Sequence, residues 1–364
     1  MFIYLHLDMT FTENFPILKN YTYLNTAYSG LLSTEIANWR RQHDENFINE
    51  GSIFRANSME IMEELRTNLS SRFSVKRENT FLTSNFSNGF NSILNGLEKS
   101  HRFLLLQEDY PSLSYPVTSR GFDYLEIPID VNLEENILTA IEQFKPTVFA
   151  FSMVQYISGL KMQSDFIKKL KSNFPDLILI ADGTQFLGTG NFNFEQSGLD
   201  VLAGSGYKWL LSGYGNGYIF LSDAAKNKIY QSKKELTLPN APFWSGRDYL
   251  SLTLEPGHLD SLSLGTLNQG LNYLKTVGFE TIEQNILKLT TKARVALHNK
   301  GLLPDWMMER KEQSSIMSLP LEQKLVNRLN EEKILVSPRG TGTRISFHFY
   351  NTEDDLNHLL EVLG

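Results

Sequence analysis

Short apolar runs alternate with amphipathic stretches through the middle of the chain, and this alternation constrains the fold more than any other feature. Helical patterns cover residues 88–97, 133–144 and 164–173. Runs typical of strands lie around them, at residues 103–106, 124–127, 147–154, 177–181, 201–203 and 217–221. Such alternation with short connections favours an α/β architecture with a mostly parallel sheet. Runs such as TVFAFSMV and LILIAD are apolar on both faces, which predicts that helices cover both sides of the sheet.

The pattern changes after about residue 255. A long helical stretch covers residues 267–298 and is broken near Gly278. The remaining candidates are strands at residues 315–319, 334–337 and 344–349 and a last helix at 353–363. Asn351 or Thr352 would cap this last helix, which has acidic residues in its first turn. The mixture of longer helices and short strands predicts a separate α+β domain.

The length of 364 residues suits roughly two domains. We predict a large domain over residues 16–255 and a small domain formed by residues 1–15 and 256–364. The opening MFIYLHLDMTFTENFP has no basic region and no small-residue cleavage site, so we interpret it as mature structure rather than a signal peptide.

Composition excludes several classes of function. The chain has no cysteine, so disulfides, thiolate-bound metal clusters and a catalytic cysteine are excluded, and we predict no metal site. The formal net charge is −7 and the basic residues are scattered, which argues against a nucleic-acid surface. No uncharged apolar run reaches the ~18 residues of a membrane span. We therefore expect a cytoplasmic protein that binds neither nucleic acid nor membrane.

Two polar residues stand at the ends of buried strands. Asp182 closes LILIAD, at the sheet edge where open α/β sheets bind ligands. A carboxylate there needs a cationic partner such as a protonated pyridine nitrogen, although a helix cap or a turn would also explain it. Lys208 follows VLAGSG between Tyr207 and Trp209, which would desolvate its amine and free it to form a Schiff base. A surface lysine in a glycine-rich turn, or glycines that bind phosphate without a Schiff base, are the alternatives.

The segment TSNFSNGF indicates a phosphate site. A strand that ends near Thr83 is followed by polar and glycine residues that open a helix. Free amides and hydroxyls at a helix N-terminus bind phosphate, although plain capping by Ser87 or Asn88 explains the same residues. No GxGxxG follows a strand and no GxxxxGK[ST] is present, so the common nucleotide signatures are absent.

Taken together, the phosphate turn, Asp182-x-x-Gln185 and Ser205-x-aromatic-Lys208 resemble the class V aminotransferase family. That family includes cysteine desulfurases, selenocysteine lyases, kynureninases and isopenicillin-epimerase-like proteins. The resemblance runs from about Tyr23 to Gly364. It implies the fold of the pyridoxal 5′-phosphate (PLP)-dependent transferases, with a sheet of the seven-stranded type in the large domain, and it implies PLP as the cofactor.

The resemblance also implies roles for single residues. Lys208 matches the Schiff-base lysine, and Asp182 matches the partner of the pyridinium nitrogen. The other residues expected to contact the cofactor are Phe86, Ser87 and Ser205 at the phosphate, Tyr110 on the ring, Gln155 and Gln185 near the 3′-oxygen, Tyr207, and Thr266 at a phosphate across a dimer interface. Arg344 matches the arginine that clamps the substrate carboxylate, and Asn25 lies in YLNTAYSG, which the family places near the substrate. A solvated strand residue for Arg344, an ordinary half-buried tyrosine for Tyr110 and a helix N-cap for Thr266 remain alternatives.

The same residues permit transamination, racemisation or β-elimination. We expect first a class V aminotransferase that moves the amino group of a small amino acid, through an aldimine of Lys208, with a 2-oxo acid as the second substrate. A C–S lyase or epimerase of the same family, a non-catalytic PLP-binding protein and an unrelated sugar- or nucleotide-binding module are the alternatives. A persulfide-forming desulfurase is not expected, because there is no cysteine and Tyr207 stands where desulfurases have histidine.

A homodimer with a shared active site is expected on two grounds. Members of the family resemble one another in building the site at a subunit interface, and Thr266 has no evident ligand within its own chain. Arg247 and His258 precede Gly265 in a loop and are candidates for substrate contact, although a solvated loop also explains them.

Overall fold

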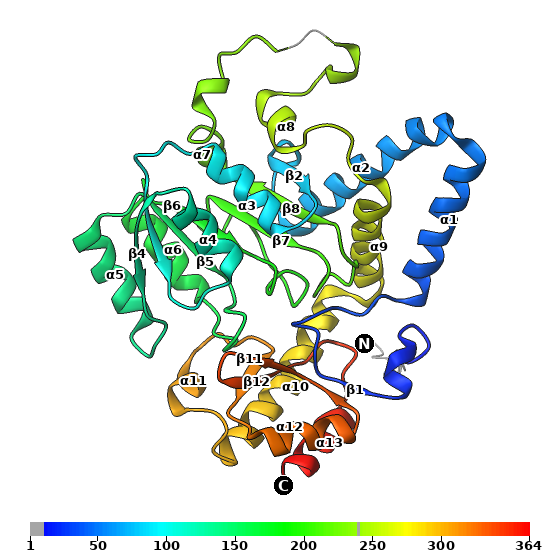
Figure 1. Ribbon diagram of the computed structural model, residues 1–364, viewed down its shortest axis with the longest axis vertical. Helices are drawn as coiled ribbons and strands as arrows, with labels where there is room; N and C mark the ends of the chain where they lie inside the picture. Colours follow the sequence, from blue (N-terminus) through cyan, green and yellow to red (C-terminus); the bar gives the residue numbers. More distant parts are fainter. Residues whose placement is uncertain (1–10, 239–240) are drawn as a thin grey trace, which may run out of the picture.

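A seven-stranded sheet forms the centre of the computed structural model, which describes residues 11–238 and 241–364 (Figure 1). The strand order is β2-β8-β7-β6-β5-β3-β4. β8 runs antiparallel to both of its neighbours, and the other neighbouring pairs are parallel. The strands are β2 (Thr80–Thr83), β3 (Arg102–Leu106), β4 (Asp123–Ile127), β5 (Val148–Ser152), β6 (Ile178–Asp182), β7 (Val201–Ser205) and β8 (Gly217–Leu221). The predicted α/β fold with a mostly parallel sheet is confirmed.

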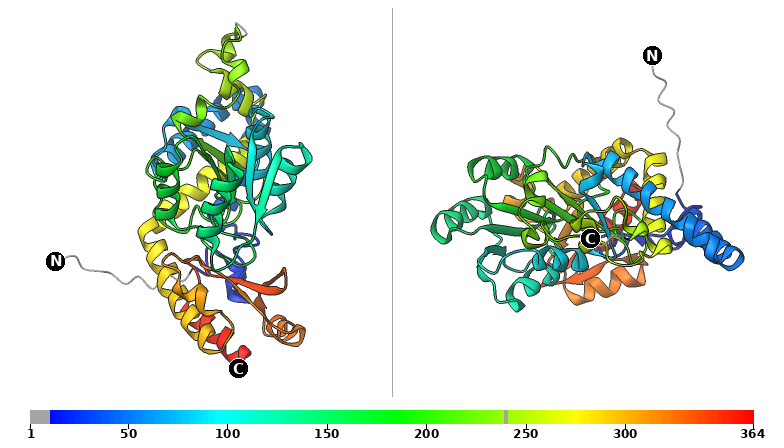
Figure 2. Two further views of the ribbon diagram at one scale, coloured as in Figure 1. Left: turned by 90° about the vertical axis from the view of Figure 1, so that its left-hand side faces the viewer. Right: turned by 90° about the horizontal axis from the view of Figure 1, so that it is seen from above.

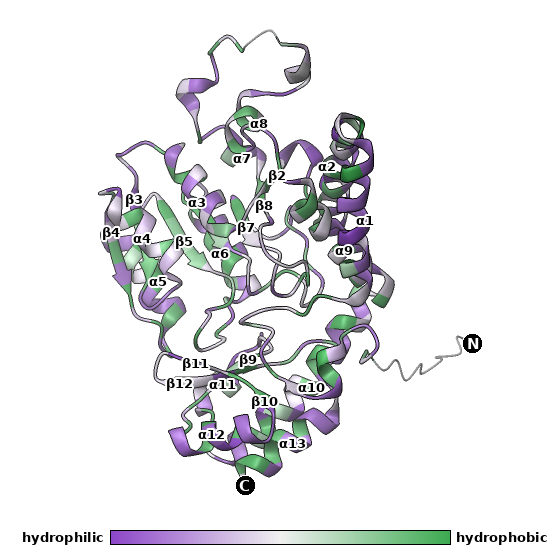
Figure 3. Cartoon of the chain, turned by 45° about the vertical axis from the view of Figure 1, so that its right-hand side comes forward, coloured by the Kyte–Doolittle hydropathy of each residue, from purple (hydrophilic) through white to green (hydrophobic). Residues whose placement is uncertain are grey.

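Helices cover both faces of this sheet, as the apolar strands predict (Figure 2). Alternate residues of β5 enter separate cores: Phe149 and Phe151 on one face, Val148 and Ala150 on the other. The first core takes in α2 (Ser52–Phe73), α5 (Leu133–Phe144), α6 (Ser164–Asn173) and α9 (Ser261–Val277). The second core takes in α3 (Phe86–Asn95), α4 (Pro111–Ser119), α7 (Asp223–Lys226) and α8 (Tyr249–Leu254). Figure 3 shows the hydrophobic colour on the central strands and the hydrophilic colour along α1 (Thr34–Glu50).

The small domain has its own sheet and its own core. Its antiparallel sheet has the order β11-β12-β9, formed by β9 (Ile316–Leu319), β11 (Ser337–Arg339) and β12 (Gly342–Ser346). Apolar side chains of these strands pack with α10 (Phe279–Asn299), α12 (Gln323–Glu331) and α13 (Glu353–Leu363). Thr352 caps α13 in a capping box with Asp355, as the sequence predicts.

Two contacts shift the domain boundaries that the sequence predicts. β1 (Thr22–Tyr23) pairs in parallel with β10 (Ile334–Leu335), so the small domain takes a strand from beyond residue 15. α9 packs against α1 and α2 of the large domain, although it follows residue 255. α9 ends before Gly278, which has a φ of 92°, and α10 then continues into the small domain. We therefore propose Gly278 as the boundary, while residues 1–10 of the predicted small domain lie outside the described residues.

Over residues 11–238 and 241–364, none of the helices has both the length and the apolarity needed to cross a lipid bilayer.

Candidate active site

A cavity of about 230 Å³ opens at the carboxyl ends of β5, β6 and β7. This is the edge of an open α/β sheet at which ligands bind. Many of the residues singled out in the sequence line it together: Phe86, Ser87, Tyr110, Asp182, Gln185, Ser205, Tyr207 and Lys208. The two side chains on which the sequence prediction depends, Asp182 and Lys208, therefore face one space.

Asp182 is a buried carboxyl that forms no ion pair with any of the described residues. It ends β6, between Ser152 of β5 and Ala203 of β7, and only 6% of it is exposed. One carboxyl oxygen accepts a hydrogen bond of 2.8 Å from the backbone N–H of Thr184. Burial raises the pKa of Asp182 to about 7. A bound cation beside Asp182 would therefore stabilise the ionised form of this carboxyl.

Lys208 is a buried amine with no hydrogen bond or ion pair to any described residue. It is 6% exposed, and its Nζ lies 5.9 Å from the ring centroid of Tyr110 and 5.4 Å from that of Tyr207. Burial lowers the pKa of Lys208 to about 7, and the charge of Arg344 acts in the same direction. This lowered pKa favours the neutral amine, which is the form that attacks an aldehyde.

The turn that carries Lys208 is held by a close backbone contact with the segment YLNTAYSG. The backbone N–H of Gly30 donates to the carbonyl oxygen of Tyr207 over 2.9 Å. A Cβ placed on Gly30 would lie 1.9 Å from the carbonyl oxygen of Lys208. Only glycine permits this approach, so the segment around Gly30 holds the lysine turn in place.

Hydroxyls and amides at the start of α3 form the polar end of the cavity. Asn85 caps the helix by accepting from the N–H of Asn88 over 2.9 Å, so the alternative of capping by Ser87 or Asn88 is wrong. The N–H of Phe86 donates to Ser205 Oγ over 2.9 Å. The hydroxyl hydrogens of Ser87 and Ser205 find no acceptor within the described part of the chain. These donors at a helix N-terminus suit a phosphate.

The two glutamines predicted near the 3′-oxygen differ in their placement. Gln185 lines the cavity, and its carboxamide joins Trp209 Nε1 (2.8 Å) to the carbonyl oxygen of Ala27 (2.9 Å). Gln155 does not line the cavity. Its oxygen accepts from the N–H groups of Ile157 and Ser158, because the turn after β5 needs partners for these amides. The structure therefore does not bring Gln155 to the site.

Arg344 and Asn25 approach the cavity from the small domain. Arg344 is only 2% exposed, which excludes a solvated strand residue, and it donates to the carbonyl oxygen of Tyr156 over 2.6 Å. Its buried Nε has no hydrogen-bond partner among the described residues. Burial lowers the pKa of Arg344 to about 10, so the guanidinium stays charged at neutral pH. Asn25 accepts from Ser337 Oγ over 2.7 Å beside β12, and neither residue forms the cavity wall itself.

The prediction for Thr266 is wrong in its premise. This residue is 0% exposed and lies in the second turn of α9. Its hydroxyl donates to the carbonyl oxygen of Leu262 (2.6 Å) and accepts from Arg40 (2.7 Å), so it does have ligands in its own chain. It is not an N-cap either, because Asp260 caps α9. Thr266 therefore links α9 to α1 within the chain, and its role at a phosphate across a dimer interface stays a prediction.

Arg247 and His258 also lie away from the cavity. Arg247 donates to the carbonyl oxygens of Ser251 and Glu255, at the end of α8. His258 meets Arg55 at 3.0 Å. Both residues therefore stabilise surface segments in this structure.

Several residues of the site escaped sequence reasoning. Tyr156, Thr184 and Tyr214 line the cavity, and the ring of Tyr156 meets Tyr110 edge to face at 5.3 Å. Asp109 directly precedes Tyr110 and is buried, which raises its pKa, and Ser152 donates to both of its oxygens. The one signal in the sequence is QEDYP, in which Asp109 lies three residues after the end of β3 and two residues before Pro111.

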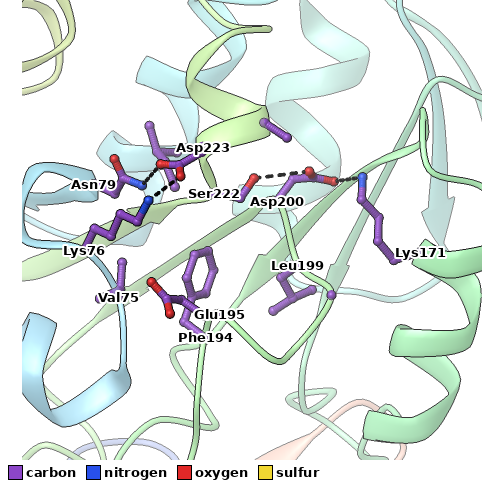
Figure 4. Close-up of a pocket in the computed structure, with 13 residues that line it drawn as sticks. Val75, Lys76, Asn79, Lys171, Phe194, Glu195, Leu199, Asp200, Ser222 and Asp223 are labelled. Atoms are coloured by element: carbon purple, nitrogen blue, oxygen red, sulfur yellow. Dashed lines mark hydrogen bonds and ion pairs between the residues drawn. The ribbon is translucent and has the colours of Figure 1, made fainter.

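A second cavity, of about 410 Å³, lies at the opposite edge of the sheet (Figure 4). Its charged side chains largely neutralise one another, since Lys76 pairs with Asp223 at 2.5 Å and Lys171 pairs with Asp200 at 2.7 Å. It contains none of the residues singled out in the sequence. The larger cavity is therefore not the centre of the chemistry.

A sequence model of the family described as aminotransferase class-V matches residues 32–359. The chain belongs to the class-V aminotransferase family. Among curated relatives, an uncharacterized aminotransferase, YcbU of Bacillus subtilis, is 19% identical over 99% of this chain and 98% of its own length. A probable cysteine desulfurase of Ureaplasma parvum is 22% identical over 97% of this chain and 96% of its own length.

Solved structures of class-V aminotransferase relatives share the fold over nearly the whole chain. A C-DES mutant with glycine covalently linked to the PLP cofactor has a TM-score of 0.85 at 19% identity, covering 97% of this chain and 98% of the other. An apo cysteine desulfurase from Thermococcus onnurineus NA1 has a TM-score of 0.81 at 17% identity, covering 97% and 96%. The expected fold of the PLP-dependent transferases is thereby confirmed.

Class-V aminotransferases use PLP, which confirms the cofactor expected from the sequence. The cavity fits this group on three observations. Among the described residues, the amine of Lys208 has no hydrogen-bond partner and the carboxyl of Asp182 has no ion-pair partner, and the hydroxyls of Ser87 and Ser205 lie at a helix N-terminus with their hydrogens available.

Proposed function

We propose that this chain is a PLP-dependent enzyme that acts at the α-carbon of a small amino acid, with transfer of the amino group as its reaction. One observation carries the proposal: Lys208 and Asp182 share a buried cavity without forming an ion pair, and burial moves the pKa of each to about 7. Such opposed shifts in one cavity are typical of catalytic sites.

The residues present would hold the cofactor at three points. Asp182 would meet the ring nitrogen, Tyr110 would pack on the ring, and Ser87, Ser205 and the N-terminus of α3 would bind the phosphate. Bound PLP supplies an electron-poor ring that accepts the electron pair of a bond broken at the α-carbon. The buried carboxyl of Asp182 would gain the cation that it lacks, which favours its ionised form.

Lys208 and Arg344 would act on the substrate. With a pKa of about 7, the amine of Lys208 both accepts and returns a proton near neutral pH, as transfer of the α-proton requires. The buried guanidinium of Arg344 would bind the α-carboxylate through donors such as its unpartnered Nε. A fixed carboxylate fixes which bond at the α-carbon faces the acceptor system.

A second candidate is elimination at the β-carbon, as in a C–S lyase. Elimination begins with the same removal of the α-proton, for which Lys208 is placed. A solved cystine C–S lyase, C-DES in complex with its reaction product cysteine persulfide, shares the fold with a TM-score of 0.84 at 19% identity. The absence of cysteine still excludes a desulfurase that carries sulfur on its own thiol.

A half-reaction experiment separates these candidates. The PLP-loaded protein is mixed with single amino acids in the absence of any 2-oxo acid, and the visible spectrum, 2-oxo acid and ammonia are followed. A transaminase stops after one equivalent of 2-oxo acid per site and resumes when a second 2-oxo acid is added. A lyase releases ammonia continuously, and Lys208→Ala should do neither. Protein that stays colourless with PLP and yields no borohydride-trapped adduct on Lys208 would refute the proposal.

The homodimer remains a proposal that rests on the family alone, because Thr266 no longer supports it. We expect sedimentation of the PLP-loaded protein to give twice the chain mass of 41.6 kDa. A monomer that is loaded and active would contradict a shared site.

A further inference from the structure

His348 belongs to the small domain but lies against the lysine turn of the large domain. It follows β12, the strand that carries Arg344, and it is only 1% exposed. Its ring centroid lies 5.3 Å from that of Trp209, the residue directly after Lys208. A buried imidazole at this junction of the two domains has no part in the proposed chemistry, so its placement needs another explanation.

The hydrogen bonds of His348 assign its tautomer. The backbone N–H of Phe349 donates to Nδ1 over 2.9 Å, so Nδ1 is the acceptor nitrogen. Nε2 therefore carries the hydrogen and donates to the carbonyl oxygen of Trp209 over 3.1 Å. Burial lowers the pKa of His348 to about 3, so the imidazole stays neutral and keeps this arrangement at neutral pH.

Trp209 is held from its other side as well. Its indole N–H donates to Gln185, which in turn donates to the carbonyl oxygen of Ala27. The backbone N–H of Ala27 then donates to Ser346 Oγ over 3.0 Å, which leads back to the segment of His348. A closed circuit of hydrogen bonds therefore surrounds the lysine turn. It runs from His348 through Trp209, Gln185 and Ala27 to Ser346.

We infer that His348 is a positioning residue for Lys208, acting through the backbone carbonyl of Trp209. The inference rests on the proposed function. One short segment of the small domain then carries both the arginine for the substrate carboxylate and the imidazole that fixes the lysine turn. A displacement of this segment that moves Arg344 would then also move the turn that carries Lys208.

Two substitutions separate positioning from general stability, because each keeps one of the two hydrogen bonds. His348→Gln retains a donor near the place of Nε2, within reach of the Trp209 carbonyl. His348→Asn retains only an acceptor near the place of Nδ1, for the N–H of Phe349. Phe347→Leu is a matched control, since Phe347 is the neighbour of His348 in the chain and is 0% exposed, but its side chain packs in the core of the small domain.

The primary readout needs no cofactor. The cofactor-free proteins are acetylated at a series of pH values, and modification of Lys208 is quantified by peptide mass spectrometry. We expect His348→Asn to move the midpoint for Lys208 by about one pH unit, whereas His348→Gln and Phe347→Leu stay near the wild type. In the loaded enzyme we expect His348→Asn to lower kcat about tenfold with little change in KM.

Equal midpoints for His348→Asn and His348→Gln would overturn the inference, whether both match the wild type or both depart from it. A midpoint shift in Phe347→Leu as large as in His348→Asn would do the same, because it would show a general effect of stability. A wild-type protein that never binds PLP would refute the proposed function, and the acetylation profile would still report on His348 separately.

Discussion

Asp182→Asn should make the cofactor-free protein more stable at neutral pH while weakening the holoenzyme. The carboxyl has a pKa of 3.8 in an ordinary setting and about 7 in the folded chain. A group whose pKa rises on folding contributes stability that is fully present below pH 4 and is lost as the pH rises through 7. Each pH unit in that window costs about 1.4 kcal/mol, so roughly 4 kcal/mol is lost by pH 8.

Asparagine has nearly the same shape and never ionises, so the variant escapes this loss. Relative to the wild type, its free energy of unfolding should rise by about 3 kcal/mol between pH 5 and pH 8. Urea denaturation of both cofactor-free proteins at the two pH values measures this difference. A difference in unfolding free energy between the two proteins that does not change with pH, or one that shifts in favour of the wild type as the pH rises, would contradict a raised pKa of Asp182.

With PLP bound the order should reverse. The ionised carboxyl then has a cationic partner in the ring nitrogen, and asparagine offers only a neutral contact. We expect at least a tenfold loss of PLP affinity in Asp182→Asn, measured by equilibrium dialysis at pH 8. A variant that binds PLP as tightly as the wild type would show that Asp182 does not face the ring nitrogen.

Three further predictions follow from the same geometry. Arg344→Lys should raise the KM for the amino acid about 10- to 100-fold with a smaller effect on kcat, whereas the exposed Arg328→Ala should change neither in steady-state assays. Gly30→Ala should destabilise the protein by about 2 kcal/mol in urea denaturation and speed the loss of PLP on dilution, whereas Gly301→Ala, which meets open space, should leave PLP retention unchanged. Borohydride trapping of an aldehyde on Lys208 in the cofactor-free protein should rise with pH up to about 8 and then level off, because the pKa of Lys208 is about 7; a rate that keeps rising toward pH 10 would contradict a buried amine.

Local sequence patterns predict the elements well because their causes are local. The helices at residues 133–144, 164–173 and 353–363 have the predicted bounds, and every predicted strand of the large sheet is present. The spacing of their apolar residues and the identity of their caps depend only on residues that are close together in the sequence. Asp182 and Lys208 could be predicted for the same reason, since Asp182 is the last residue of β6 and Lys208 lies three residues after the end of β7.

What the sequence does not predict depends on contacts between distant segments. Thr266 resembles a phosphate ligand, but Arg40, which lies far away in the sequence, occupies its hydroxyl. Gln155 resembles a cofactor contact, but its own turn uses its carboxamide. Tyr214 reaches the site through the packing of a separate loop, and no local pattern marks it. The period of the helices also gives no sign that α9 remains with the large domain.

The parallel pairing of β1 with β10 has a consequence for the order in which the protein is built. A ribosome completes residues 22–23 more than 300 residues before it adds their partners, so this N-terminal strand must wait unpaired while the large sheet forms. The segment that follows it contains Ala27 and Gly30, which support the lysine turn. Nascent chains halted before residue 334 should therefore hold PLP poorly, and the vitamin B6 coenzyme should be captured firmly only after synthesis is almost finished.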